Sequence, residues 1–304
     1  SAAELSKAEF FSQYAGAAAC NSGNAPGQAV TCSNNACPAV QADKATTVAS
    51  FTALLTDVRG YVAIDPAASL IVASFRGSSS VRNWITNFVF TQIPCDLTAG
   101  CLIHTGFATG WAEVSANVTK AVAAAKAANP SYQLVVTGYS LGGAIATLAA
   151  AYLRKGGYAA DLYTFGCPRV GNDVFAAYVT GQAGAEYRVT HTDDPVPRLP
   201  PIIFNYRHTS PEYWLTDDAE MPTVAEVEVC PGYANTSCNA GTTGLDTDAH
   251  GQYFGQISAC SSGGTAFRKR DPADMSDAEL EQLLNMWVAQ DVAFVENGTA
   301  TAAV

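Results

Sequence analysis

One serine of the chain stands in a setting that could make it a nucleophile. The run Gly138-Tyr139-Ser140-Leu141-Gly142-Gly143 follows an apolar segment at 133–137 and precedes a stretch with helical periodicity. A serine on such a sharp strand-to-helix turn has a strained backbone and an exposed hydroxyl, and glycines two residues away let the chain fold back. The helix N-terminus also places backbone N–H groups beside any developing negative charge. The pattern predicts that Ser140 attacks a carbonyl carbon.

A serine hydroxyl is a weak nucleophile, so this hypothesis requires a base and a carboxylate that orients the base. Three histidines follow the serine: His191, His208 and His250. We predict His250 as the base, because it lies in a late loop that can reach over the ends of strands. His191 precedes the nearby acids and lies only three residues from Asp194, a poor spacing for a base on a loop, and we expect it to be part of the scaffold. We expect the same of His208 and of His104.

The carboxylate is expected at the end of a strand, where it can meet a loop histidine. Asp193 and Asp194 follow a predicted strand at 187–190 after two intervening residues. In the α/β-hydrolase architecture the acid comes after the serine and before the histidine in the chain, and both residues satisfy this order. Their position alone does not choose between them.

The elements that must position these residues alternate between strand and helix. Strands are predicted at 54–64, 70–75, 133–137, 161–165 and 187–190, and helices at 4–19, 107–129, 141–155 and 172–180. Strands that alternate with helices pair in parallel through right-handed crossovers, so the predicted fold class is α/β.

Composition limits the kinds of function that are open to the chain. Of its 304 residues 48% are hydrophobic and 14% are charged, which excludes a chain that is disordered throughout. The 27 acidic and 16 basic residues give a net charge of −11, which argues against nucleic-acid binding. No apolar stretch is long enough for a transmembrane helix. The chain begins with Ser1 and shows no leader, so we expect a processed mature protein.

Cysteine usage predicts a secreted protein with disulfides. The nine cysteines form three pairs that are close in sequence, two that bracket most of the chain, and Cys167 in an apolar run. Disulfides fit this distribution better than a metal site, but spacing leaves the connectivity open. Cys167 is expected to be a buried free thiol. Three glycosylation sequons, at Asn117, Asn235 and Asn297, agree with secretion.

Several stretches of the chain resemble the class 3 lipases of filamentous fungi. These stretches are 75–78, 104–107, 137–143, 190–200, 210–214 and 249–255, and they lie in the family's order within residues 1–260. The resemblance implies an α/β-hydrolase fold, with a mostly parallel central sheet flanked by helices and a short helical lid. It implies the triad Ser140–Asp194–His250 and thereby selects Asp194 over Asp193. It also implies an oxyanion hole formed by the Ser78 hydroxyl and backbone with the Leu141 N–H.

The resemblance also implies how cysteines pair. It gives the disulfides Cys20–Cys260, Cys32–Cys37 and Cys95–Cys101. Cys230 and Cys238 depart from the family pattern, and a fourth disulfide between them is our extrapolation.

A short segment after residue 80 is predicted to be an amphipathic helix. Its apolar residues, Val81, Trp84, Ile85, Phe88 and Val89, follow the i, i+3, i+4, i+7, i+8 pattern. By itself this pattern is typical of a helix packed on a core. Given the resemblance, we expect a lid at about 80–90 that covers Ser140 in water and moves aside at a lipid surface.

The chain changes character after Cys260. Residues 261–264 have the composition of a linker, Lys269-Arg270 is a dibasic pair, and Ser276 with Glu279 can form a capping box. Apolar residues then mark one helix face: Leu280, Leu283, Leu284, Trp287 and Val288. We therefore divide the chain into a catalytic domain at 1–260 and a linker with an amphipathic helix at 261–304. The helix is interpreted either as an addition docked on the domain or as a removable segment.

The functional prediction is a secreted triacylglycerol lipase that hydrolyses acylglycerols at a lipid–water interface through an acyl-enzyme. The alternatives on the same scaffold are a phospholipase A1 and a feruloyl-esterase-like carboxylesterase. A catalytically inactive protein that adsorbs to surfaces would lack a member of the triad, and none is missing. No cofactor and no metal is expected. The expected partner is the lipid interface, with no nucleic acid, and the protein is expected to be a monomer.

Overall fold

A single large sheet organises the molecule. The computed structural model describes residues 1–77, 85, 89–260 and 275–302. The sheet has eight strands in the order β1-β2-β3-β6-β7-β8-β9-β10. Their bounds are β1 Thr46–Thr52, β2 Arg59–Asp65, β3 Leu70–Phe75, β6 Gln133–Tyr139, β7 Ala160–Phe165, β8 Glu186–His191, β9 Glu212–Leu215 and β10 Val227–Cys230. The strands from β3 to β9 in this order are parallel, and the pairs β1–β2, β2–β3 and β9–β10 are antiparallel. The predicted α/β class is confirmed.

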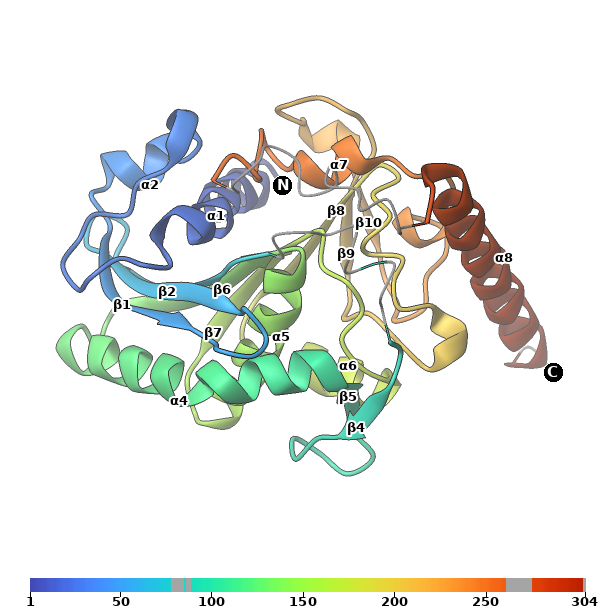
Figure 1. Ribbon diagram of the computed structural model, residues 1–304, viewed down its shortest axis with the longest axis horizontal. Helices are drawn as coiled ribbons and strands as arrows, with labels where there is room; N and C mark the ends of the chain where they lie inside the picture. The colour runs from blue at the N-terminus through green and yellow to red at the C-terminus, as the bar shows by residue number, and fades with distance from the viewer. Residues whose placement is uncertain (78–84, 86–88, 261–274, 303–304) are drawn as a thin grey trace.

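Helices cover both faces of the sheet. The bounds are α1 Ala2–Asn21, α2 Pro38–Ala42, α4 Thr105–Ala128, α5 Leu141–Lys155, α6 Asp173–Thr180, α7 Thr247–Gly251 and α8 Asp277–Ala302, and a small hairpin joins β4 Gln92–Pro94 to β5 Leu102–His104. Figure 1 shows α1 over one face and α4 and α5 over the other, with α8 at the opposite end of the molecule from α2. Within the described parts of the chain, no helix combines the length and apolar character needed to cross a membrane.

Two apolar cores lie on the two faces of the sheet. Successive side chains of a strand point to opposite faces, so a buried strand supplies both cores. In β3, Ile71 and Ala73 pack with α4 and α5, whereas Leu70 and Val72 pack with α1. The central strands are therefore fixed from both sides, and the loops at their ends have a rigid base.

The first strands differ from those predicted. The sequence suggested one strand at 54–64, whereas β1 ends at Thr52, a loop follows, and β2 begins at Arg59. The leucines at 54 and 55 are apolar, which made the loop resemble a strand. The carboxylate of Glu113 on α4 accepts hydrogen bonds from their backbone N–H groups, and these take the place of strand pairing.

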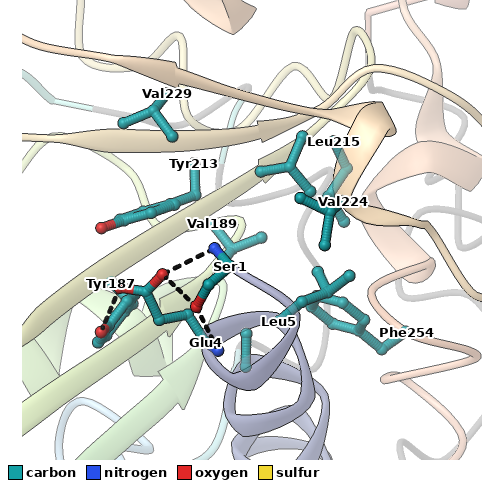
Figure 2. A pocket seen from close by; sticks show the side chains of 12 residues that line it. Ser1, Glu4, Leu5, Tyr187, Val189, Tyr213, Leu215, Val224, Val229 and Phe254 are labelled. Atoms are coloured by element: carbon teal, nitrogen blue, oxygen red, sulfur yellow. Dashed lines mark hydrogen bonds and ion pairs between the residues drawn. The ribbon is translucent and has the colours of Figure 1, made fainter.

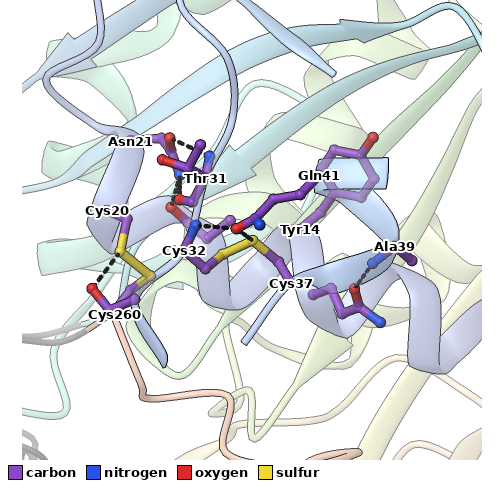
Figure 3. The surroundings of a disulfide bond; sticks show 12 residues. Tyr14, Cys20, Asn21, Thr31, Cys32, Cys37, Ala39, Gln41 and Cys260 are labelled. Atoms are coloured by element: carbon purple, nitrogen blue, oxygen red, sulfur yellow. Dashed lines mark hydrogen bonds between the residues drawn. A yellow bond between two sulfur atoms is a disulfide. The ribbon is translucent and has the colours of Figure 1, made fainter. Parts of the chain in front are cut away.

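Four disulfides tie the loops to this framework. The structure joins Cys20 to Cys260, Cys32 to Cys37, Cys95 to Cys101 and Cys230 to Cys238. Figure 3 shows the first two beside the end of α1. Cys167 is free and buried, and burial raises the pKa of its thiol to about 12. The thiol therefore stays protonated at neutral pH, as expected of a packing residue.

The three sequon asparagines lie at or near the surface. Asn117 on α4 and Asn297 on α8 are exposed, and Asn235 is half-buried. The Asn235 amide nitrogen donates to the Pro231 carbonyl oxygen at 2.9 Å.

Candidate active site

Ser140 occupies the turn between β6 and α5. Its backbone has φ 57° and ψ −131°, in the left-handed range that side chains rarely adopt. Gly138 and Gly142 make this turn possible. A Cβ on Gly138 would lie 2.2 Å from the Gly142 carbonyl oxygen, and a Cβ on Gly142 would lie 2.1 Å from the Phe75 carbonyl oxygen. The strained turn holds the hydroxyl at the carboxyl edge of the sheet.

The structure brings the three predicted triad residues together. The Ser140 Oγ lies 3.0 Å from the Nε2 of His250, which belongs to α7. The Nδ1 of His250 lies 2.8 Å and 3.0 Å from the two carboxylate oxygens of Asp194. All three side chains are buried, with exposed fractions of 1% or less. This is the arrangement in which an imidazole can take the serine proton and a carboxylate can stabilise the resulting imidazolium.

Asp194 is held by further donors that the sequence did not reveal. The Tyr253 hydroxyl donates to its Oδ2 at 2.6 Å, and the Val196 N–H donates to its Oδ1 at 2.9 Å. Burial and then the Asp194 charge raise the pKa of Tyr253 well above its usual range, so this hydroxyl remains a donor. The Asn239 amide nitrogen donates to the Asp194 carbonyl oxygen at 3.0 Å. The only sequence signal for Tyr253 was its place in the stretch 249–255.

The neighbouring acid and the other histidines do not join this arrangement. Asp193 lies next to the triad acid in the chain, but the carboxylate that contacts His250 is that of Asp194. The ring nitrogens of His191 contact the backbone oxygens of Ala249 and Asp217 at 3.0 and 3.1 Å. His191 therefore holds the turn that carries His250 rather than acting on Ser140.

His104 and His208 are scaffold residues, as expected. The His208 Nε2 donates to the Pro197 carbonyl oxygen at 2.7 Å, and burial lowers the pKa of His208 well below its usual range. His104 caps α4, since its Nδ1 accepts from the N–H groups of Gly106 and Phe107. Burial lowers the pKa of His104 to about 4, so the ring stays neutral and can accept these bonds.

One half of the predicted oxyanion hole lies within the described residues. Leu141 is the first residue of α5, directly after Ser140. Ser78 lies outside the described residues, but the preceding Gly77 is close to the nucleophile. A Cβ built on Gly77 would lie 3.2 Å from the Ser140 Cβ. The chain that leads to Ser78 therefore runs beside the serine.

Two of the five predicted lid residues are described. Ile85 is buried and packs with Val196 and Leu199, which follow Asp194 in the chain. Val89 is 63% exposed, and its carbonyl oxygen accepts from the His104 Nε2 at 2.7 Å. Val81, Trp84 and Phe88 lie outside the described residues.

The C-terminal helix α8 packs on the same region. Leu280 and Leu284 join the cluster that contains Ile85, and the Trp287 ring lies 5.2 Å from the Phe90 ring. Asp291 is buried and accepts from the N–H groups of Ile202 and Ile203 at 2.8 and 3.0 Å. In the structure, α8 is thus a docked helix that shares an apolar cluster with Ile85, a residue of the predicted lid.

A separate apolar cavity of about 220 Å³ lies elsewhere, between the start of α1 and the strands β8 to β10. Figure 2 shows Leu5 of α1 facing Val189 and Leu215, with Tyr187 and Tyr213 at one side. The triad residues are not among those that line it. This cavity is therefore distinct from the arrangement around Ser140.

The sequence of the chain is similar to those of known fungal lipases. Residues 72–204 match the family model described as Lipase (class 3). The chain is 54% identical to secreted mono- and diacylglycerol lipase 1 of Fusarium solani, over 97% of this chain and 88% of that protein. It is 42% identical to secreted mono- and diacylglycerol lipase A of Penicillium cyclopium, over 88% of this chain and 90% of that protein.

Solved structures show the same likeness. A crystal structure of a mutant form of the Penicillium cyclopium enzyme superposes with a TM-score of 0.81 at 41% identity, covering 86% of this chain and 99% of that chain. The mono- and diacylglycerol lipase from Aspergillus oryzae also gives a TM-score of 0.81 at 41% identity, over 84% and 98% of the two chains.

Proposed function

This chain belongs to the class 3 lipases, and on that premise we propose that it hydrolyses the ester bonds of acylglycerols at a lipid–water interface through a Ser140 acyl-enzyme. It is a secreted lipase with the α/β-hydrolase fold. The contact between the Ser140 Oγ and the His250 Nε2, at 3.0 Å, is the single observation that carries the proposed mechanism.

In the first step, His250 takes the proton of Ser140 while the serine oxygen attacks the ester carbonyl carbon. The tetrahedral intermediate carries a negative charge on its oxygen, which the Leu141 N–H and the Ser78 hydroxyl and backbone are proposed to stabilise. Asp194 stabilises the imidazolium. His250 then donates its proton to the leaving alcohol, and the acyl group remains on Ser140.

In the second step, His250 takes a proton from water, and the water oxygen attacks the acyl carbon. Collapse of the second intermediate returns the proton to Ser140 and releases a fatty acid. Burial of the triad favours both steps, because charges interact more strongly away from bulk water.

The proposed substrate class follows from the relatives, which are named mono- and diacylglycerol lipases. The sequence alone suggested triacylglycerols, so the assay compares emulsified monoolein, diolein and triolein. Phosphatidylcholine and methyl ferulate test the phospholipase and feruloyl-esterase alternatives. We expect hydrolysis of the glycerides to exceed that of both alternatives; methyl ferulate as the preferred substrate would contradict the proposal.

Replacing the nucleophile tests the mechanism directly. We expect Ser140→Ala to lower kcat by roughly 10⁴-fold or more, because the covalent step is lost while the fold remains. The measurement is diolein hydrolysis, with circular dichroism as the control for folding. Residual turnover within about tenfold of the unsubstituted enzyme, in a folded variant, would remove Ser140 from its proposed role.

The lid, the tail and the monomeric state complete the proposal. A lid at about 80–90 should give a rate that rises sharply when a short-chain ester passes its solubility limit. A smooth hyperbolic rate curve across that limit would contradict the lid.

Residues 261–304 are proposed as a segment separate from the catalytic domain. Equal activity of the full chain and of residues 1–270 would exclude a regulatory role for this segment. Light scattering tests the monomer.

A further inference from the structure

The turn between β1 and β2 carries the most exposed large apolar side chains that the structure describes. Leu54 is 93% exposed and Leu55 is 86% exposed. At the base of this turn Ala53 and Val58 are buried, and the Ala53 N–H donates to the Val58 carbonyl oxygen at 2.7 Å. The two leucines therefore stand at the tip of a turn whose base is part of the core.

The backbone of the tip is held in place by one carboxylate. Glu113 Oε1 accepts from the N–H groups of Leu54 and Leu55 at 3.1 and 3.0 Å. Its Oε2 accepts from the Thr56 N–H at 3.0 Å and from the Thr56 hydroxyl at 2.5 Å. These bonds, that of the Thr56 hydroxyl first, lower the pKa of Glu113, so the carboxylate stays ionised. In an unrestrained loop the hydrophobic effect would favour folding the leucines onto the protein surface. Here the hydrogen bonds to Glu113 fix the backbone, so the leucine side chains stay exposed.

The tip lies at the edge of the sheet that carries the nucleophile. In the antiparallel pair of β2 with β3, the Arg76 N–H donates to the Arg59 carbonyl oxygen at 2.8 Å. Asp57 of the turn pairs with Arg76 at 2.5 Å. The next residue, Gly77, lies against Ser140. The turn is thus braced on the strand exit that passes the serine, and Figure 1 shows it as the blue turn next to α4.

We propose that Leu54 and Leu55 form an anchor that enters the acyl region of a neutral or zwitterionic lipid surface. The anchor sets the edge of the sheet that carries Ser140 against that surface. The inference rests on the proposed function, since it supplies the contact that an enzyme acting on aggregated lipid requires.

The shape and charge of the molecule favour a lipid surface over a protein partner. A stable protein interface buries a broad, complementary area on each side, whereas two side chains on a convex turn supply little area. A lipid surface accepts a protruding apolar group without a matching shape. The net charge of −11 gives no attraction to anionic headgroups, so apolar contact has to supply the binding.

The test separates binding from catalysis. The double variant Leu54→Ser/Leu55→Ser is mixed with vesicles of diether phosphatidylcholine, a lipid without carboxylic ester bonds. We expect partitioning to weaken roughly 100-fold, about tenfold for each leucine. Hydrolysis of a dissolved short-chain ester should stay the same, because neither leucine touches the triad. Hydrolysis of dilute diolein emulsion should fall with binding.

Two matched variants sharpen the result. Val229→Ser removes a 53% exposed aliphatic residue of β10 and should leave partitioning unchanged. Glu113→Gln keeps both leucines but places an amide NH₂ where a carboxylate oxygen accepted, so we expect partitioning to weaken several-fold. Equal partitioning of the double variant and Val229→Ser would overturn the anchor. A Glu113→Gln variant that binds like the unsubstituted protein would overturn the role of the fixed backbone.

The outcomes also distinguish this inference from the proposed function. A protein that loses vesicle binding with Leu54 and Leu55, but hydrolyses no acylglycerol, would contradict the function and leave the anchor in place. Normal acylglycerol hydrolysis together with unchanged vesicle binding in the double variant would contradict the anchor and leave the proposed function in place.

Discussion

At the scale of single residues, the site depends on how firmly Asp194 is held. Its carboxylate lies 2.8 Å from the His250 Nδ1 and accepts from the Tyr253 hydroxyl at 2.6 Å. A carboxylate fixed by several donors keeps the imidazole in the orientation and tautomer that leave Nε2 free to act on the serine. Tyr253 is therefore a positioning residue in the proposed mechanism.

Tyr253→Phe removes this hydroxyl and little else. A hydrogen bond to a charged group contributes about 1.5 kcal/mol, so we expect kcat to fall about tenfold. KM for a dissolved ester should change little, because Tyr253 is proposed to act on the carboxylate rather than on substrate. Steady-state kinetics on such an ester measure both values. Tyr139→Phe is the matched control, since the Tyr139 ring packs on His250 at 4.8 Å. Equal kcat values for the two variants would contradict the role of the Tyr253 hydroxyl.

At the scale of elements, α8 is attached by a buried charge as well as by apolar packing. Asp291 and Arg169 are both buried, with a carboxylate-to-guanidinium distance of 3.3 Å. Burial lowers the pKa of Arg169 to about 10, so it remains charged at neutral pH. The same carboxylate also satisfies two backbone N–H groups of the turn at 202–204.

Asp291→Ala should therefore release α8. The change leaves a buried guanidinium unpaired, and we expect the free energy of unfolding to fall by about 3 kcal/mol. Since Leu280 and Leu284 of α8 belong to the same apolar cluster as Ile85 of the proposed lid, the rate on dissolved ester should also rise. Calorimetry and ester hydrolysis measure the two effects. Glu281→Ala, on the exposed face of α8, is the control. An unchanged melting temperature in Asp291→Ala would contradict the attachment.

At the scale of the whole molecule, the Cys20–Cys260 disulfide joins segments 240 residues apart. It ties the segment that follows His250 to the end of α1. Ile257 in this segment packs into the core under α1, close to Gly16. The disulfide thus couples the turn of the catalytic histidine to the first helix.

Replacing both Cys20 and Cys260 by serine should lower the free energy of unfolding by about 5 kcal/mol, because the unfolded chain regains the conformational freedom of a long loop. Cys32→Ser/Cys37→Ser, which opens a loop with a separation of 5, should lower it by only about 2 kcal/mol. Urea unfolding under non-reducing conditions measures both values. Equal losses would show that loop length does not govern the stabilisation.

The sequence determined the family, the fold class and the order of the catalytic elements. The turn around Ser140 needs glycines on both sides, and the residues next to Ser140 in the sequence show this requirement directly. The alternation of strands and helices is equally local, because it follows from periodicity along the chain. The choice of His250 as the base followed from its place in a late loop, whereas the choice between Asp193 and Asp194 required the family.

Tertiary structure alone decided which distant groups meet. Nothing near residue 54 indicates that Glu113 replaces strand pairing there, and the apolar leucines predicted a strand instead. The contact of Tyr253 with Asp194 and that of Asp291 with Arg169 join residues 59 and 122 positions apart. Such contacts depend on where the whole sheet places the ends of its strands. A sequence pattern records only the neighbours of each residue along the chain, so these contacts could be read only from the folded molecule.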